Sequence, residues 1–210
     1  MIIVHHLNNS RSQRILWLLE ELGVDYEIKK YQRDTTTNLA PPELTAVHPL
    51  GKSPVITDDD VRIHESAAIV DYLINQYGNG ALQPAHDTRD YVRYVEWMHY
   101  AEGSAMLPLL LNLYTSRLGD AAAPLAPRIQ SEIENHFSFM EAELEGRQYF
   151  VGDNLTGADI MLSFPLEAAK ATGQLVDSKN IAAFVDRVQA RPAYRAALEK
   201  GGAYAYGPQA

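Results

Sequence analysis

The stretch from Gly51 to Ile69 constrains the fold of this chain more than any other part of its sequence. It predicts two short strands joined by an acidic turn, followed directly by the first turn of a helix at Glu65-Ser66. Free backbone N–H groups and the positive end of the helix dipole favour a carboxylate at such a helix start. Ser66 can add a hydroxyl donor and Glu65 can pair with a nearby cation, so the pair fits the head of an α-amino acid. Pro54 opens the first strand and leaves an edge where an extended peptide can pair.

Charge and composition narrow the classes of partner. The 210-residue chain has a formal net charge of −9, which argues against nucleic acid or an anionic membrane as its main partner. No apolar run is long enough to span a bilayer, and the first residues lack the pattern of a secretory signal, so we expect a cytoplasmic protein. The sequence contains no cysteine, which excludes disulfides and thiolate metal sites. Any thiol chemistry must therefore use a thiol that the ligand carries.

The first 79 residues follow the pattern of an α/β domain. Apolar residues alternate in the predicted strands and recur at helical spacing between them. The predicted order is strand, helix, strand, a long loop, two strands and a helix, at residues 2–7, 12–22, 26–30, around 55, around 61 and 66–77. The first strand, helix and second strand should form a right-handed parallel unit.

The remainder of the chain is predicted to be helical. Residues 79–87 contain Gly and Pro without periodicity and are interpreted as a linker. Helices are predicted over residues 88–113, 125–144, from 156 onwards, 181–190 and 193–200. Thr156 and Asp159 have the spacing of a capping box. We therefore predict two domains, residues 1–79 and 88–210, with residues 201–210 loosely held.

Several motifs occur in an order and at spacings that resemble the cytosolic glutathione transferases, and the first helix is most similar to the bacterial members that use serine. The resemblance covers nearly the whole chain, and the joint order of the motifs is far more specific than any one of them. The motifs are Ser10-Arg11-Ser12-Gln13-Arg14, His48-Pro49-Leu50-Gly51-Lys52-Ser53-Pro54, Glu65-Ser66, Leu82-Gln83-Pro84 and Leu155-Thr156-Gly157-Ala158-Asp159-Ile160.

The resemblance implies a thioredoxin-like α/β amino-terminal domain that binds glutathione and an all-α carboxyl-terminal domain. Glu65 and Ser66 would then hold the γ-glutamyl head, and the Ser53 backbone would pair with the cysteinyl residue. A cis Pro54 would aim those backbone groups, and Lys52 would meet the glycyl carboxylate as a point charge. Members of the family often have Val or Ile where this chain has Ser53. Glutathione is implied as co-substrate, with no metal.

Ser10 matches the catalytic serine of the serine-type members, four residues before Arg14. Its hydroxyl would stabilise the thiolate of glutathione, which is the attacking form of the thiol. The start of the first helix lies next to Ser10 and should favour the same anion. Ser10 could instead be a simple helix cap, and Ser12 and Asn9 are the alternative donors.

By the same resemblance, the long helix after the linker would line a pocket for a hydrophobic electrophile, with Tyr100 and Met106 as candidates. A stripe of such residues is also typical of a core. The predicted reaction is attack of the thiolate on the electrophile. Alternatives are reduction of disulfides or peroxides through bound glutathione, or a binding protein without catalysis. Resemblance also implies a homodimer.

The seven histidines give only a weak indication of a metal site. His5 and His6 are adjacent on a predicted strand, so their side chains should point to opposite faces of the sheet. We therefore expect no metal.

Overall fold

The computed structural model describes residues 1–175 and 177–208. The chain divides into two compact units, one made of Met1–Gln83 together with the chain from Val188 onwards, and the other of Pro84–Arg187. The predicted domains were 1–79 and 88–210, whereas in this division the chain from Val188 onwards lies with the first unit. The reason is that α9 (Pro192–Gly201) packs against the helix α1 (Gln13–Leu22) of the first unit.

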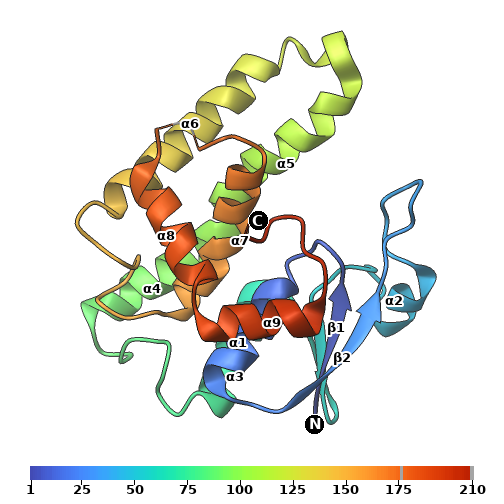
Figure 1. Cartoon of the computed structure of the whole chain (residues 1–210), viewed down its shortest axis with the longest axis vertical. Helices are drawn as coiled ribbons and strands as arrows, with labels where there is room; N and C mark the ends of the chain where they lie inside the picture. The colour runs from blue at the N-terminus through green and yellow to red at the C-terminus, as the bar shows by residue number, and fades with distance from the viewer. Residues whose placement is uncertain (176, 209–210) are drawn as a thin grey trace. The chain divides into compact units, whose positions relative to one another are not determined.

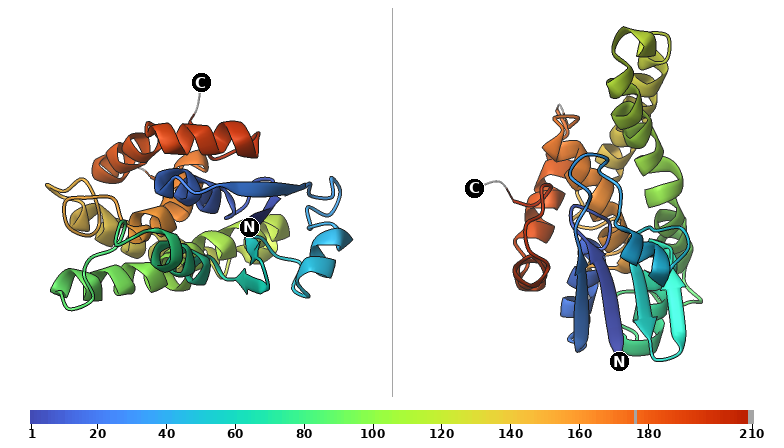
Figure 2. Two further views of the ribbon diagram at one scale, coloured as in Figure 1. Left: turned by 90° about the horizontal axis from the view of Figure 1, so that it is seen from below. Right: turned by 90° about the vertical axis from the view of Figure 1, so that its right-hand side faces the viewer.

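The first unit contains a four-stranded sheet in the order β2-β1-β3-β4. The strands lie side by side in the right-hand view of Figure 2, with β1 and β2 in blue next to β3 and β4 in cyan. β1 and β2 are parallel, whereas β1–β3 and β3–β4 are antiparallel. The elements of this part are β1 (Ile2–Leu7), α1, β2 (Tyr26–Tyr31), α2 (Pro42–Val47), β3 (Val55–Asp58), β4 (Val61–His64) and α3 (Ser66–Tyr77). The thioredoxin-like α/β fold predicted for this half is confirmed.

The short helix α2 was not predicted. It begins at Pro42 directly after Pro41, and proline is favoured in the first turn because the N–H it lacks would have no partner there. Leu44 is its only fully buried residue among those described for this helix, and it packs in a small cluster with Leu7 and Tyr31. With only six residues, α2 carries too little periodic signal to be distinguished from a loop.

The helix α1 forms the centre of the first unit. Its residues from Gln13 to Leu19 are buried, and it packs against both α3 and α9. Figure 1 shows α9 running alongside α1. Trp17 meets Tyr194 edge to face with ring centroids 5.4 Å apart, and the Nε1–H group of Trp17 donates to Glu21 at 2.7 Å. The guanidinium group of Arg191 pairs with the same Glu21 carboxylate at 2.5 and 2.8 Å.

The chain beyond α9 is held in place, which corrects the prediction of a loose carboxyl-terminal segment for the residues up to 208. Gly207 is buried. The backbone N–H of Ala205 donates to the Asn9 side-chain oxygen at 2.8 Å. The last ten residues are mostly Gly, Ala and Tyr, and they show no periodicity that would reveal such a contact. The partner, Asn9, lies almost two hundred positions earlier in the sequence.

The second unit is helical, as predicted, and α5 and α6 lie side by side in it (Figure 1). The single helix predicted over residues 88–113 is interrupted by a π-helical segment at Ala101–Ala105. Pro108 follows one turn later and has no N–H to donate, which disfavours a regular helix here. The helices are α4 (Arg89–Tyr100), α5 (Met106–Thr115), α6 (Ala126–Glu143), α7 (Gly157–Ala171) and α8 (Lys179–Gln189), with a 3₁₀ segment at Ser116–Ala122.

The predicted capping box at the start of α7 is present. The Asp159 carboxylate accepts the backbone N–H of Thr156 at 2.8 Å and that of Phe150 at 2.9 Å. Complete burial raises the pKa of Asp159 to about 6, against the opposing effect of these hydrogen bonds. Among the described helices, none combines the length and apolarity that crossing a bilayer requires.

Candidate functional site

The register of the sheet brings the predicted site residues of the first unit to one end of it. His5 of β1 is paired with Val55 of β3, and Val55 is paired with His64 of β4. The carboxyl end of β1, the start of β3 and the end of β4 therefore lie in one row. Ser10 follows the first of these points, Ser53-Pro54 precedes the second, and Glu65-Ser66 follows the third.

Ser10 lies in the loop between β1 and α1, and the residue is only 5% exposed. Its hydroxyl oxygen is 2.8 Å from the Ser12 hydroxyl oxygen, and it accepts the backbone N–H of Ser12 at 3.2 Å. It also lies 3.4 Å from the hydroxyl oxygen of Ser53, at the long limit of a hydrogen bond. Ser12 occupies the N-cap position of α1, and its side chain makes no capping hydrogen bond.

Ser53 and Pro54 are fixed against β1. The Ser53 hydroxyl donates to the backbone oxygen of His5 at 2.9 Å and accepts the backbone N–H of Leu7 at 3.3 Å. The Ser53–Pro54 peptide bond is cis, and Pro54 is buried. A serine in place of an aliphatic residue thus supplies a hydroxyl that joins β1 to the loop before β3 and reaches Ser10.

The loop that carries Ser10 is anchored from both sides. The Asn8 side-chain oxygen accepts the backbone N–H of Arg33 at 2.8 Å, and the Arg33 side chain donates to the backbone oxygen of Asn8 at 3.2 Å. The Asn9 side-chain oxygen accepts from Ala205, as described above, and Asn9 has a positive φ of 49°. Asn9 is therefore engaged with the end of the chain, whereas Ser10 and Ser12 contact each other.

The backbone at Glu65 is unusual. Glu65 has φ 69° and ψ 120°, a conformation that residues with a Cβ adopt at a cost of about 1–3 kcal/mol. Such strain is typical of ligand sites, where the surrounding structure enforces it. Glu65 itself is exposed, Ser66 is 4% exposed at the start of the twelve-residue helix α3, and Lys52 is exposed.

His6 is a residue of this region that the sequence analysis considered only as a metal ligand. Its Nδ1 lies 2.8 Å from the Ser12 hydroxyl oxygen, and its side chain is 4% exposed. Burial, with a smaller contribution from the nearby Lys30, lowers the pKa of His6 to about 4. His6 is therefore neutral at physiological pH. Alternation of side chains along the strand was the only sequence signal that could have placed the His6 side chain on the face of the sheet that α1 covers.

The two predicted electrophile-binding residues lie in the second unit. The Tyr100 hydroxyl is 2.6 Å from Nδ1 of His136, and burial raises the pKa of Tyr100 to about 12. Met106 is buried at the start of α5, directly after the π-helical segment. Segments of this kind are frequent at functional sites.

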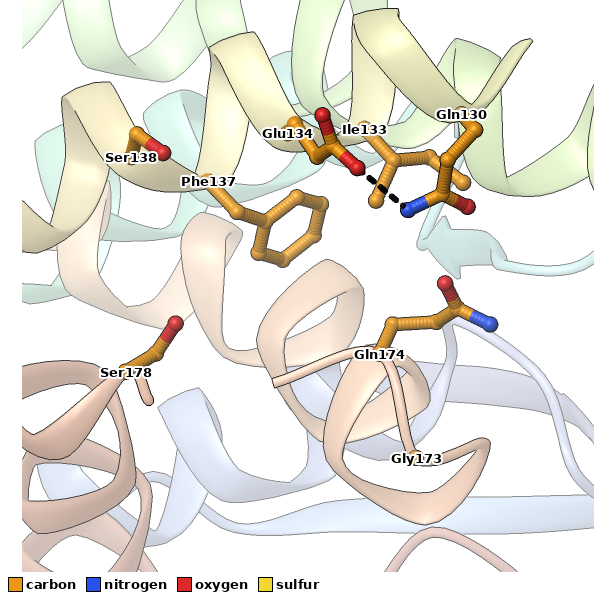
Figure 3. A pocket seen from close by; sticks show the side chains of 8 residues that line it. All are labelled: Gln130, Ile133, Glu134, Phe137, Ser138, Gly173, Gln174 and Ser178. Carbon is orange, nitrogen blue, oxygen red and sulfur yellow. Dashed lines mark hydrogen bonds between the residues drawn. The ribbon is translucent and has the colours of Figure 1, made fainter. Parts of the chain in front are cut away.

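Neither residue lines the cavity that the second unit shows between α6 and the connection from α7 to α8 (Figure 3). That cavity has a volume of about 390 Å³, and a hydrogen bond of 3.1 Å joins Gln130 and Glu134 at its rim. Its lining residues are Gln130, Ile133, Glu134, Phe137, Ser138, Gly173, Gln174 and Ser178. Within the part of the chain that the structure describes, no group of three or more His, Asp or Glu side chains is arranged to hold a metal ion.

Comparison with known proteins identifies the relatives of this chain. Residues 1–75 match the family model "Glutathione S-transferase, N-terminal domain", and residues 104–192 match "Glutathione S-transferase, C-terminal domain". The chain is 37% identical to glutathione S-transferase 3 of Schizosaccharomyces pombe, over 95% of this chain and 88% of that protein. It is 32% identical to glutathione S-transferase 1 of Saccharomyces cerevisiae, over 95% of each. The crystal structure of a glutathione S-transferase from Actinobacillus pleuropneumoniae superposes with a TM-score of 0.88 at 40% identity, covering 96% of this chain and 93% of that one.

Proposed function

Because the chain belongs to the glutathione S-transferase family and uses glutathione as its co-substrate, we propose that the row of residues at the end of the sheet is its glutathione site. The observation that carries this assignment is the meeting of Ser10 and Ser53 beside the start of α1, in register with Glu65-Ser66. These residues come from three separate segments of the sequence.

The size of the site agrees with a tripeptide. Ends of neighbouring strands are about 4.8 Å apart, so the ends of β1 and β4, with β3 between them, are separated by about 10 Å. An extended tripeptide spans about the same length. In this proposal the γ-glutamyl head lies at Glu65-Ser66 and the cysteinyl residue pairs with the backbone of Ser53. Its sulfur then lies beside Ser10, and Lys52 meets the glycyl carboxylate.

The charges of the site suit the two ends of the ligand. A γ-glutamyl head carries a carboxylate and an ammonium group. The N-terminal N–H groups of α3 and the Ser66 hydroxyl favour the carboxylate, and the exposed Glu65 carboxylate favours the ammonium group.

Ser10 is the proposed catalytic residue. A free thiol has a pKa of about 8.5, so only a few per cent of it is ionised at pH 7. A hydroxyl donor directed at the sulfur stabilises the thiolate and lowers this pKa. The thiolate then forms a carbon–sulfur bond with the electrophile, a leaving group such as halide departs with the bonding electrons, and the thiol proton passes to solvent.

The second substrate is proposed to be a small hydrophobic electrophile, with Tyr100 and Met106 in its pocket. Support for Met106 comes from its place next to the π-helical segment, and support for Tyr100 from a hydroxyl held by His136. By analogy with the family we further propose a homodimer that acts in the cytoplasm.

The glutathione assignment is tested by titrating the tripeptide into the protein and into Glu65→Ala in a calorimeter. Loss of one charge-assisted contact should weaken binding by about tenfold to a hundredfold. Asp60→Ala is the matched control, because it removes an equal charge at the opposite end of the same hairpin, where Asp58 and Val61 pair. An unchanged dissociation constant for Glu65→Ala, or equal losses in both variants, would remove Glu65 from the site.

A further inference from the structure

The hydroxyl of Ser10 has only one hydrogen, and its direction decides whether Ser10 can stabilise a thiolate. The oxygen of Ser10 accepts the backbone N–H of Ser12. If it also accepts the Ser12 hydroxyl hydrogen across the 2.8 Å contact, both of its lone pairs are used and its own hydrogen must point elsewhere. The remaining neighbour is Ser53 at 3.4 Å, whose hydroxyl already donates to His5. Because this contact is long, the Ser10 hydrogen can readily leave the Ser53 oxygen and donate to a thiolate sulfur instead.

If the contact runs the other way, Ser10 donates to Ser12 and offers no hydrogen to the sulfur. The direction depends on His6, because Nδ1 of His6 lies 2.8 Å from the Ser12 oxygen. When Nδ1 carries the hydrogen, it donates to Ser12, and Ser12 donates to Ser10. When Nε2 carries it instead, Nδ1 accepts from Ser12 and the chain reverses. The backbone oxygen of Leu7, at 3.4 Å, is a poorer alternative acceptor for Ser12.

His6 is one of the residues that line a cavity of the first unit. The cavity has a volume of about 210 Å³, enough for several water molecules. Nε2 of His6 lies 3.5 Å from the position that a Cβ atom on Gly201 would occupy, and both residues line the cavity. The complete lining is His6, Asn8, Asn9, Lys30, Gln32, Gly201, Gly202 and Ala203.

Three side chains of this lining, those of Lys30, Asn8 and Asn9, offer hydrogen-bond donors. Lys30 carries an ammonium group, which has no acceptor. The side-chain oxygens of Asn8 and Asn9 already accept from Arg33 and Ala205, so their amide N–H groups remain available. Donors, or water molecules that they orient, favour an unprotonated Nε2. The hydrogen of a neutral His6 then resides on Nδ1.

We propose that His6 and Ser12 are positioning residues for the transferase reaction, and that the donor-lined cavity holds His6 in the Nδ1–H tautomer so that the Ser10 hydrogen is directed at the glutathione sulfur. The hydrogens run from His6 to Ser12, from Ser12 to Ser10 and from Ser10 to the thiolate. The inference rests on the proposed role of Ser10. No covalent step is added, since each group keeps its own hydrogen.

The other groups packed around His6 are compatible with this arrangement. They include Ser12 at the N-cap of α1, the uncharged Gln13 in its first turn, and Gly201 at the end of α9. Lys30 on β2 is the charged group that faces it, and its positive charge disfavours a doubly protonated His6. The pKa of about 4 leaves the imidazole neutral in the working range of pH, where the tautomer rather than the charge is the variable.

The tautomer can be measured directly. Nitrogen-15 shifts of the histidine rings in the glutathione-bound protein distinguish Nδ1–H from Nε2–H, and the His6 signals are assigned by their loss in His6→Asn. We expect the Nδ1–H form. A predominant Nε2–H form would overturn the proposal, and the tautomer itself is read from the parent protein.

The effect on the thiol is measured by titrating the ultraviolet absorbance of bound glutathione thiolate. Ser12→Ala should raise the thiol pKa by about half a unit to one unit, the value of one neutral hydrogen bond. Ser12→Thr keeps the hydroxyl and should restore most of the shift. His6→Leu should resemble Ser12→Ala, and His6→Asn, whose amide can donate from near the position of Nδ1, should lie closer to the parent protein.

Lysine variants test the role of the cavity. Lys30→Met should raise the thiol pKa and increase the Nε2–H fraction of His6. Lys29→Met removes the same charge from the next residue, which lies near His5 and Tyr31, and should change neither. Equal shifts in both lysine variants would indicate a general charge effect and would contradict the role of the cavity.

The failure of this inference can be told apart from failure of the Ser10 assignment. If Ser10→Ala raises the thiol pKa while Ser12→Ala and His6→Leu leave it unchanged, only the positioning role is wrong. If Ser10→Ala also leaves it unchanged, the assignment of Ser10 is wrong as well.

Discussion

Replacing Ser10 by Ala should produce a loss of activity whose size depends on pH. In the arrangement proposed above, Ser12 donates to Ser10 across their 2.8 Å contact and the Ser10 hydrogen has only the 3.4 Å contact to Ser53, so little is lost in the unliganded protein when the hydroxyl is removed. With glutathione bound, that hydrogen meets an anion. A hydrogen bond to a charged group contributes about 1.5–3 kcal/mol, which corresponds to about one to two units in the thiol pKa.

The assay is conjugation of glutathione to an aryl halide, followed as kcat/KM against pH. Below both pKa values the Ser10→Ala protein should be about tenfold to a hundredfold slower, because its thiolate fraction is smaller by that factor. Above both values the two rates should converge. Glutathione affinity should change little, because most binding contacts lie elsewhere in the site.

Ser163→Ala is a suitable control, because Ser163 is also a buried serine but donates only to the backbone oxygen of Ile160 within α7. It should leave the pH profile unmoved. Two results would refute the reasoning about Ser10. One is an unchanged kinetic pKa. The other is a loss that is equal at every pH, which would indicate a role in geometry instead of ionisation.

Two further predictions concern stability. In the folded protein the pKa of His6 is lowered from 6.5 to about 4, so the unfolded chain binds a proton before the folded chain does as the pH falls. The free energy of unfolding should therefore decrease by up to about 3 kcal/mol between pH 6.5 and pH 4. Urea unfolding of the parent protein and of His6→Asn across this range measures that free energy. An identical pH dependence in the two proteins would contradict the prediction. Gly201→Ala would place a Cβ 2.9 Å from both Gln13 and Leu16, so thermal unfolding should show a loss of about 1–3 kcal/mol. Gly103→Ala is its control, because that Cβ meets nothing within 4 Å, and equal losses in the two would show that the packing of α9 on α1 is not the cause.

The sequence predicted the fold through local signals. Helical spacing from Ile15 to Leu22 and alternation in the strands depend only on residues a few positions apart, and these elements form as predicted. The Thr156–Asp159 cap is equally local. The helix α2 was missed because six residues hold less than two turns of periodic signal. The interruption at Ala101–Ala105 was missed because it leaves the apolar stripe of the helix almost unchanged.

The sequence also identified the motif residues Ser10, Ser53-Pro54 and Glu65-Ser66, because each is a short local pattern whose order can be compared with a family. Local patterns predicted the strands, most of the helices and the side chains that lie at their ends. How those side chains meet is set by tertiary packing. The contact of Ala205 with Asn9 and the packing of α9 on α1 join positions far apart in the chain, and the pairing of Ser12 with His6 depends on how the loop between β1 and α1 folds. Tertiary contacts form when apolar surface is buried between helices, strands and loops. The pattern of neighbouring residues does not encode which distant segment will pack against a given one.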